Sequence, residues 1–522
     1  MNTRSIIYEL KRSNWFYWSV CLLVFVWASL FLFQQINLHS ADIGRHLKNG
    51  ELILDGQFDL LYQNTYSYTN SDFPVVTHHW LAGVIFFVIF QMVGWSGLIC
   101  FYAVLHGLAV VALVLSAPDR LQSWLRLAVS FMVIPLFAIR FELRPEGFSY
   151  LFFSIFISLM ELYRSRIISY RWLFGLIPLM MIWVNTHIFF VLGLGVVMVY
   201  LIDEWIQNRN IPSWNWILLF GLILACLVNP FGVYGALAPL LIFENFGYEL
   251  VENQTVFFLF ERFGGGQYVH FGLLVVCFVG LLVLSLWKRY VGSGIVFFSM
   301  CLALLLVGGY VARMMSLFAL VSIVGFGLLI NQMSELYRWK KNHLFVFCIG
   351  IIGVFIGLGL LLSPMYISPF RRTFGLGLLP QTLSAGDFVI TNHLEGPLFN
   401  NYDNGGYWIY NLFPEIPVFV DNRPEAYPNE FFSDEYIPMQ DDSAVWDVMM
   451  HRYQFNLIAF YWHDFTPWGQ NFITRIVKDE HWIPVYVDQY EVILVRNIEK
   501  NSEVIERFGL DRERFSMQRV SR

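Results

Sequence analysis

Long apolar runs recur along the first two thirds of this 522-residue chain. The first, Trp15–Phe33, contains no charged residue and is long enough to cross a bilayer as a helix. Only 14% of all residues are charged, whereas soluble domains have about 25% charged residues. A chain with this pattern places its apolar surface in lipid. The sequence therefore predicts a polytopic α-helical membrane protein with the bilayer as its main partner.

Basic residues orient the predicted spans. Arg4, Lys11 and Arg12 precede the first run, and no small-residue cleavage site follows it. The run is therefore expected to remain as an uncleaved helix, with its N-terminus in the cytoplasm. Residues 34–78 then form a first external loop. The next two runs, Trp80–Val93 and Leu98–Ser116, are separated only by residues 94–97, a spacing that predicts a tight helical hairpin.

The short run Trp124–Ile139 decides how many times the chain crosses the membrane. It contains Pro135 and is flanked by arginines. If it crosses, the arginine-rich Arg164–Arg171 lies outside, against the positive-inside rule. We therefore expect a short helix that does not cross. The remaining predicted spans are Phe148–Tyr163, Trp172–Val184, Ile188–Ile202, Trp216–Val228, Phe271–Trp287, Val296–Val307, Met314–Ile330 and Leu344–Leu362. The total is about eleven spans.

The composition changes near Ser363, so residues 1–363 are predicted as a transmembrane domain and residues 364–522 as a soluble extracytoplasmic domain. Short β-rich runs alternate there with helical patterns, which favours an α/β fold. The expected strands are Phe388–Thr391, Val418–Asp421, Leu457–Tyr461, Ile483–Val487 and Val492–Val495, and the expected helices are Ser443–Tyr453 and Pro467–Lys478. Residues 234–270 are expected to form a lateral helix and loop outside the membrane.

The cysteines and the net charge indicate which bonds and binding partners the sequence does not predict. All six cysteines lie inside apolar runs, which indicates neither a disulfide framework nor a zinc site. The net charge of −6 gives no indication of nucleic-acid binding.

Polar residues from distant segments are gathered by this topology at the outer membrane face. They are Asp42, His46, His78, His79, Arg140, Arg144, Glu146, Asn185, His187, Asn229 and Arg313. Charged groups at a membrane boundary indicate a functional site. Here they suit transfer of a group from an anionic lipid carrier. A carboxylate takes the proton of an attacking hydroxyl, and arginines stabilise the departing phosphate. We assign Asp42 as the base, with Arg313 and Arg144 on the phosphate.

Each of these residues also has a structural explanation. Asp42 follows a membrane helix and can be a helix cap or a salt-bridge partner. Arg140 and Arg144 can form an i, i+4 ion-pair ladder with Glu142 and Glu146 at an interface. Asn185 and His187 can cap two half-helices, and Asn229 precedes a proline that ends a helix. His46 can be a metal ligand, although one histidine and one carboxylate are too few for a defined site.

Eight short motifs follow one another along most of the chain. They are Asp42–His46 with Lys48–Gly50, Asn64–Thr69, His78–Leu81, Arg144–Glu146, Trp183–His187, Asn229–Gly232, Asn404–Tyr407 and Val418–Arg423. Together they resemble the GT-C superfamily of multispanning glycosyltransferases. Within it they are similar to a bacterial branch related to protein O-mannosyltransferases and lipid A aminoarabinose transferases.

The resemblance implies an inverting sugar transfer from a polyprenyl-phosphate donor to a glycan, lipid or protein acceptor. The reaction would take place on the outer face of the inner (cytoplasmic) membrane. An acidic residue of the first external loop is central in this family, and here it is Asp42. Ile43 and Gly44 follow it in place of a second acidic residue, so we expect neither a metal nor another cofactor. His46, His79, Glu146, Asn185, His187 and Asn229 are expected to contribute to donor or substrate binding.

Asp421 and Arg423 lie at the end of a predicted strand, where α/β domains often bind ligands. A structural ion pair that holds the domain to the membrane part explains them equally well. Two other functions remain open. A transporter is expected to have repeated halves, and no such repeat is found in the sequence. A non-catalytic protein of envelope biogenesis would retain the same fold without activity.

Overall fold

The computed structural model describes residues 15–209, 211–241, 247–248, 253–288, 294–338, 350–351, 354 and 374–515. The predicted span Leu344–Leu362 lies outside these residues except for 350, 351 and 354, as do Arg4, Lys11 and Arg12. The chain divides into two compact units. The first comprises Met1–Gln35, Ser96–Leu240 and Leu250–Leu376, and the second comprises Ile36–Trp95, Leu241–Glu249 and Gly377–Arg522.

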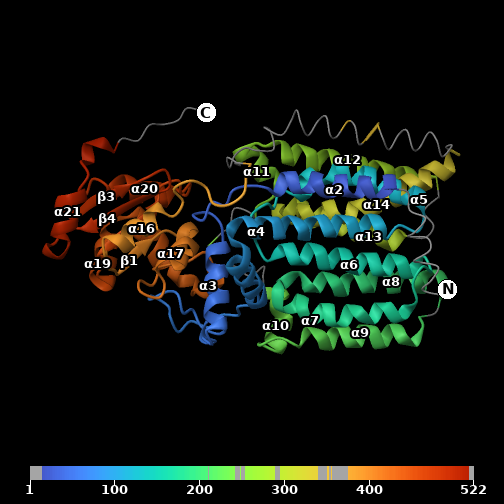
Figure 1. The fold of residues 1–522 in the computed structure, drawn as a ribbon, viewed down its shortest axis with the longest axis horizontal. Helices are drawn as coiled ribbons and strands as arrows, with labels where there is room; N and C mark the ends of the chain where they lie inside the picture. Colours follow the sequence, from blue (N-terminus) through green and yellow to red (C-terminus); the bar gives the residue numbers. More distant parts are fainter. Residues whose placement is uncertain are drawn as a thin grey trace. The chain divides into compact units, whose positions relative to one another are not determined.

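The first unit is a bundle of apolar helices that run side by side (Figure 1). They are α2 (Trp15–Leu32), the second half of α4 (Trp80–Leu115), α5 (Arg120–Phe137), α6 (Glu146–Arg164), α7 (Leu176–Thr186), α8 (Val191–Asn208), α9 (Ser213–Cys226), α10 (Val233–Leu241), α11 (Val256–Phe263), α12 (Gly266–Trp287), α13 (Ile295–Tyr310) and α14 (Met315–Leu336). Short 3-10 turns, η2 (Tyr170–Gly175), η3 (Ile188–Phe190) and η5 (Ala312–Met314), interrupt the bundle.

Among the described residues, four helices are long and apolar enough to cross a membrane: Trp80–Leu115, Ile188–Asn208, Gly266–Trp287 and Ala312–Leu336. Leu121–Phe137, Ser213–Cys226 and Ile295–Tyr310 are shorter apolar helices. The apolar window of the last long helix, which contains α14, is 89% buried, so α14 forms the centre of the bundle.

Helix α5 packs along α14 from end to end. Ser316 at the start of α14 donates to the carbonyl of Phe137, 3.1 Å away, and Gly327 lies against the Arg126 side chain near the start of α5. The two helices are therefore antiparallel neighbours inside the bundle. The helix spans Arg120–Phe137 in place of the expected Trp124–Ile139, and its predicted failure to cross the membrane stays a prediction.

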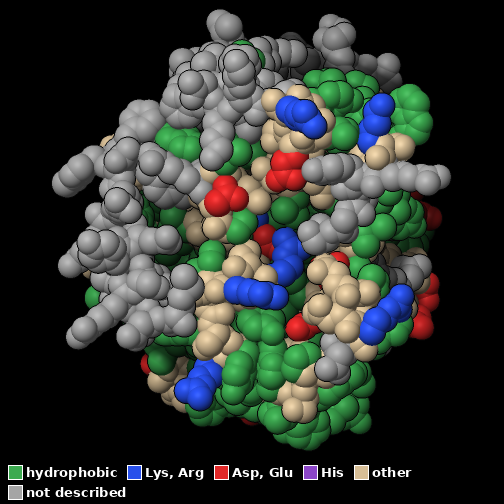
Figure 2. All heavy atoms as spheres, turned by 90° about the vertical axis from the view of Figure 1, so that its right-hand side faces the viewer, with side chains coloured by type: hydrophobic (Ala, Val, Ile, Leu, Met, Phe, Trp, Pro, Cys, Tyr) green, Lys and Arg blue, Asp and Glu red, His purple; other side chains and the backbone are tan. Residues whose placement is uncertain are grey.

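A buried ion network joins three helices of this unit. The guanidinium of Arg126 donates to the Glu161 carboxylate at 2.6 Å, and both side chains are fully buried. Arg164 pairs with the same carboxylate at 2.7 Å, and the Tyr200 hydroxyl donates to it at 2.8 Å. Such burial is tolerated because each charge has a partner. Figure 2 shows one end of the bundle, where charged side chains of both signs lie among apolar ones.

Helix α4 passes from one unit to the other and breaks at Gly94, whose φ of 64° and ψ of −166° are not helical. The predicted hairpin over residues 94–97 is thus a single break at Gly94, a conformation that glycine adopts without strain. The half before it packs on α3 (Ile43–Leu54) through two glycines. A Cβ on Gly50 would lie 2.3 Å from the carbonyl oxygen of Gly83, so the two backbones touch.

The second unit contains a four-stranded sheet of order β1-β2-β4-β3. Strands β1 (Leu398–Asn400) and β2 (Leu457–Tyr461) are parallel, whereas β4 (Glu491–Arg496) runs antiparallel to both β2 and β3 (Trp482–Val487). The surrounding helices are α3, α16 (Ser384–Thr391), α17 (Gly405–Leu412), α18 (Ile437–Asp441), α19 (Ser443–Tyr453), α20 (Pro467–Ile476) and α21 (Ser502–Phe508). Buried aromatic side chains, including Phe399, Trp446, Phe455 and Phe472, fill its core.

Three predicted strands and both predicted helices of this unit are confirmed: β2 and α19 with the predicted bounds, and β3, β4 and α20 with shifted ends. The prediction of a strand at Phe388–Thr391 is wrong, because these residues end α16. Its buried face is Ala385, Gly386 and Val389, a helical spacing that the short run concealed. Val418–Asp421 is not a sheet strand either; it is buried and forms one isolated bridge, between Val418 and Ser67.

The first external loop folds with the C-terminal residues in the second unit. Ile36 pairs with Leu378 and Ser67 with Val418, and the Tyr68 hydroxyl donates to the carbonyl of Leu398 at 2.9 Å. These bonds satisfy the polar backbone of two segments that carry little regular structure of their own. Segments that lie far apart in the sequence therefore fold together in this unit.

We expect Arg126→Met to lower the unfolding free energy by about 3–5 kcal/mol, because a buried carboxylate loses one of its two cationic partners. The measurement is the thermal midpoint of the purified protein in lipid nanodiscs. Arg126→Met combined with Glu161→Leu removes both charges and should recover most of the loss. A single variant as stable as the natural chain would contradict the importance of this network.

Candidate functional site

Asp42 stands at the N-terminus of α3 in the second unit and is half-buried. Aspartate at this position usually accepts a hydrogen bond from a backbone N–H of the first turn. All of α3 is described, and no such capping bond is formed by the Asp42 side chain. Its Oδ1 instead accepts a hydrogen bond from Nδ2 of Asn422. The carboxylate is thus directed away from its own helix, contrary to the helix-cap explanation.

Asn422 connects Asp42 to a neighbouring cation. Its Oδ1 accepts from Nε of Arg45 at 3.1 Å, while its Nδ2 donates to Asp42. A close backbone approach supports this arrangement: a Cβ on Gly44 would lie 2.9 Å from the carbonyl oxygen of Gly406. The first turns of α3 and α17 therefore meet beside Asp42. The motif Val418–Arg423 includes Asn422, but no sequence pattern favoured this residue over the charged residues on either side.

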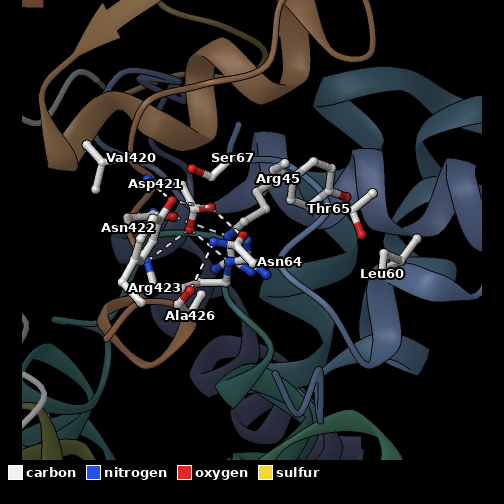
Figure 3. Close-up of polar contacts among 12 residues, drawn as sticks. Arg45, Leu60, Asn64, Thr65, Ser67, Val420, Asp421, Asn422, Arg423 and Ala426 are labelled. Carbon is white, nitrogen blue, oxygen red and sulfur yellow. Dashed lines mark hydrogen bonds and ion pairs between the residues drawn. The ribbon is translucent and has the colours of Figure 1, made fainter. Parts of the chain in front are cut away.

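Asp421 and Arg423 form a buried bidentate pair (Figure 3). Nε of Arg423 donates to Oδ1 of Asp421 at 2.8 Å, and its terminal nitrogen donates to Oδ2 at 2.6 Å. The same guanidinium donates to Oδ1 of Asn64 at 2.8 Å and lies over the Tyr66 ring. Burial by itself lowers the pKa of Arg423, but Asp421 outweighs this and raises the pKa above its ordinary value. The pair therefore joins the first external loop to the C-terminal residues within the second unit, and the expected link to the membrane part stays a prediction.

The histidines of the first loop lie together in the same unit. The ring of His46 faces that of His79 edge to face, with centroids 5.8 Å apart, and His79 lies 3.9 Å from His78. Burial lowers the pKa of His78 to about 4, so it is neutral at physiological pH. His78 consequently contributes no positive charge for a phosphate. Among the described residues, no group of three or more His, Cys, Asp or Glu side chains can hold a metal.

Arg140, Arg144 and Glu146 lie in the first unit, between α5 and α6. Arg140 donates to Glu146 through Nε at 2.8 Å and through a terminal nitrogen at 2.5 Å. Arg144 pairs with Glu142 at 3.0 Å. Each arginine thus already has a carboxylate partner, although neither pair has the i, i+4 spacing of the anticipated ladder. The Arg144 side chain keeps 19% of its surface exposed, so one face of this charge still reaches solvent.

Asn185 and Asn229 hold helix ends in the first unit. Nδ2 of Asn185 donates to the carbonyls of Met181 and Val228, both at 2.7 Å, which ties α7 to the end of α9. Nδ2 of Asn229 donates to the carbonyl of Cys226, and its Oδ1 accepts from the backbone of Phe231. These bonds satisfy broken backbone, so both residues have a structural role.

His187 ends α7 and lies in a chain of buried hydrogen bonds. Nε1 of Trp183 donates to Oγ of Ser149 at 2.7 Å, and this hydroxyl is 2.9 Å from Nδ1 of His187. The backbone N–H of Phe189 also points to Nδ1. Arg313 lies in the 3-10 turn η5 between α13 and α14. Both residues are at helix junctions, where backbone leaves the regular hydrogen-bond pattern.

Asp403 is a candidate that the sequence motifs did not single out. It precedes Asn404, the N-cap of α17. The surrounding protein, together with Asp464 and Asp42, raises the pKa of its carboxyl to about 7. Shifted acids near other acids are frequent in functional sites. The sequence signal that could have identified Asp403 is its position directly before the motif Asn404–Tyr407.

The structure brings the predicted residues together in two separate groups. Asp42, His46, His79, Asp421 and Arg423 belong to the second unit. Arg144, Glu146, Asn185, His187, Asn229 and Arg313 belong to the first, at helix ends that the antiparallel packing places at one end of the bundle. The predicted joint action of Asp42 with Arg144 and Arg313 stays a prediction.

No protein-family model and no curated protein sequence matches the chain. Among solved structures, it is similar to the archaeal oligosaccharyltransferase AglB from Archaeoglobus fulgidus, solved in complex with an inhibitory peptide and a dolichol-phosphate. The TM-score is 0.53 at 11% identity, and the match covers 91% of this chain and 74% of AglB. The likeness shows a shared fold, and four helices of the described residues are long and apolar enough to cross a membrane. The GT-C superfamily and its bacterial branch stay predictions.

We expect Asp403→Asn to stabilise the protein at pH 8 and to have little effect at pH 4. A carboxyl whose folded pKa is raised to about 7 stabilises the fold below its unfolded pKa, and this contribution is lost as the pH rises toward 7. After allowance for the exposed part of the side chain, the gain is about 1 kcal/mol, or roughly 2–4 °C. Thermal midpoints between pH 4 and 8 measure it; equal midpoints at pH 8 would contradict the shifted pKa.

Proposed function

We propose that this protein is an inverting glycosyltransferase that moves a sugar from a polyprenyl-phosphate donor to an acceptor hydroxyl at the outer membrane face. The observation that carries the proposal is the Asp42 carboxylate, which is directed away from α3 and held by Asn422. The fold similarity to AglB, a transferase solved with a lipid phosphate, supports the same reaction class. The acceptor is a glycan, lipid or protein.

In the proposed reaction, Asp42 accepts the proton of the acceptor hydroxyl as its oxygen attacks the anomeric carbon of the sugar. The new C–O bond forms on the face opposite the phosphate, which inverts the anomeric centre. The bond between that carbon and the phosphate oxygen breaks, and its electron pair remains on the phosphate. Asn422 donates a hydrogen bond to one carboxylate oxygen and thereby orients the group that takes the proton.

The departing phosphate requires positive charge where its negative charge develops. We assign this role to Arg144 and Arg313 of the first unit, with Glu146 and His187 near them at helix junctions. We assign His46 and His79 to binding of the sugar that is transferred. We propose no metal ion. Asp42 is the one acidic residue of the first external loop to which we assign a role in the reaction, and a single carboxylate is too few ligands for a metal site.

For the topology, we propose that α5 crosses the membrane and that the half of α4 before Gly94 does not. The first follows from the antiparallel packing of α5 on α14, and the second from the packing of Gly83 on α3 in the second unit. The chain then still crosses about eleven times, with the basic Arg164–Arg171 inside and the C-terminal part outside.

Asp42→Asn should reduce sugar transfer by about 10²–10⁴-fold, because the amide cannot take the acceptor's proton. Its Oδ1 can still accept from Asn422, so the fold should persist. Transfer is measured in reconstituted membranes with a panel of polyprenyl-phosphate-linked sugars and envelope extract as the acceptor source. The matched control is Asp59→Asn, an exposed carboxylate of the same loop that should leave the rate unchanged. Unchanged transfer by Asp42→Asn would remove the catalytic assignment.

A cysteine at Ser169, an exposed residue of the loop after α6, tests the topology. In a chain whose native cysteines are replaced by alanine, we expect it to be protected from a membrane-impermeant maleimide added to intact cells. A cysteine at Asp59 in the first external loop should be labelled under the same conditions. External labelling at position 169 would overturn the proposed crossing of α5.

A further inference from the structure

Three fully buried side chains of the second unit meet at one carboxylate. Glu491, the first residue of β4, accepts from Nδ1 of His39 at 2.8 Å and from Nδ2 of Asn404 at 2.9 Å and 3.1 Å. All three residues are 0% exposed. A carboxylate removed from water destabilises a fold unless donors replace its hydration. Burial accordingly raises the pKa of Glu491, and the bonds from His39 and Asn404 oppose that rise.

The His39 ring is enclosed by aromatic side chains. Tyr407 stacks on it with centroids 3.9 Å apart, Tyr490 lies at 4.6 Å and Tyr461 at 6.1 Å, all within 28° of parallel. The backbone N–H of His39 donates to Oδ1 of Asn37 at 3.1 Å. The imidazole therefore cannot turn without displacing two rings, so its Nδ1 remains directed at Glu491. We define His39, Glu491 and Asn404 as the His39 network.

The network fixes the two chain segments that meet around Asp42. His39 lies three residues before Asp42, on the segment that leads into α3. Asn404 is the N-cap of α17, and a Cβ on Gly406 two residues later would lie 3.6 Å from Nδ2 of Asn422 and 3.8 Å from the carbonyl oxygen of Ala41. A shift of either segment therefore changes the contact between Asn422 and Asp42.

The helix caps support the same conclusion. Aspartate and asparagine are preferred N-caps because their side chains accept from the first turn. Every residue of α3 and α17 is described, and neither Asp42 nor Asn404 makes such a bond. Both side chains make long-range bonds instead, to Asn422 and Glu491. Each helix thus lacks a local stabilising bond, while its first turn is fixed by the rest of the unit.

We propose that the His39 network is a positioning device for Asp42: Glu491 binds the segment before α3 and the start of α17, and thereby holds the Asp42 carboxylate against Asn422. His39, Glu491 and Asn404 are positioning residues and do not touch the substrate. Only one part of this inference, the expected effect of the network on sugar transfer, rests on the proposed function. Its structural part concerns the orientation of Asp42 and is tested without any substrate.

The test is the rate at which a water-soluble carbodiimide labels Asp42 in the full chain in nanodiscs, followed by peptide mass spectrometry. His39→Phe keeps the stacked ring and removes the donor to Glu491. We expect Asp42 to be labelled at least threefold faster in this variant, because the carboxylate leaves Asn422 and becomes more exposed. His39→Asn, whose side-chain amide lies where Nδ1 lies, should restore the natural rate. Asn404→Ala should behave like His39→Phe.

A purely structural role would give a different pattern. Phe472→Leu, in the aromatic core between Phe399 and Trp446, should lower the thermal midpoint as His39→Phe does and leave Asp42 labelling unchanged. Unchanged labelling in His39→Phe, or equal acceleration in Phe472→Leu, would overturn the proposal.

The transfer assay separates this inference from the proposed function. If the natural chain transfers sugar, His39→Phe should reduce the rate about 10²-fold, because a displacement near 1 Å at a reacting group has that effect. His39→Asn should recover most of it. If the natural chain transfers nothing, the proposed function fails, while the labelling pattern still decides whether the network positions Asp42.

Discussion

The removal of charge from water constrains both units of this structure more than any other interaction. Arg126 and Glu161 are buried in the bundle, and Asp421 with Arg423 and Glu491 with His39 are buried in the second unit. Each group has an oppositely charged partner at 2.6–2.8 Å, and Arg423 reaches another segment through its hydrogen bond to Asn64. Because a buried charge without a partner would cost several kcal/mol, these pairs specify which segments must lie together. They are more informative about the fold than the apolar contacts, which many sequences could form.

Asp42 differs from these carboxylates in its surroundings. It is half-buried, and its Oδ1 accepts a hydrogen bond from the amide of Asn422. An amide donor orients a carboxylate without removing its negative charge, whereas a bidentate arginine would hold both oxygens and favour the ionised form so strongly that proton transfer would be impeded. The other end of the same amide accepts from Arg45. Orientation by an amide suits the proton-accepting role proposed for Asp42.

The sequence predicted the apolar helices, three of the four strands and the motifs that gather around Asp42, because periodicity and local turn residues report on local structure. It did not predict Asn422, His39 or Glu491. Asn422 is one of many uncharged polar residues, and His39 and Glu491 are 452 positions apart, so no local pattern connects them. Asp421 and Arg423 were found, but only their contact with Asn64 showed that they join two segments of the unit. Short strands such as β1 were missed for the same reason, since three residues carry no period.

Two different assignments of the membrane topology give the same total. The sequence prediction counts Trp80–Val93 as a span and leaves α5 out, whereas the topology proposed from the packing on α3 and α14 does the reverse. Both assignments give about eleven crossings and place Arg164–Arg171 inside, because the positive-inside rule constrains the number of crossings between two loops and not which helices make them. Hydropathy also could not separate the two helices: α5 contains Arg126 and Pro135, which depress its apparent apolarity. Only the buried partner of Arg126 explains why a charged helix can lie among the spans.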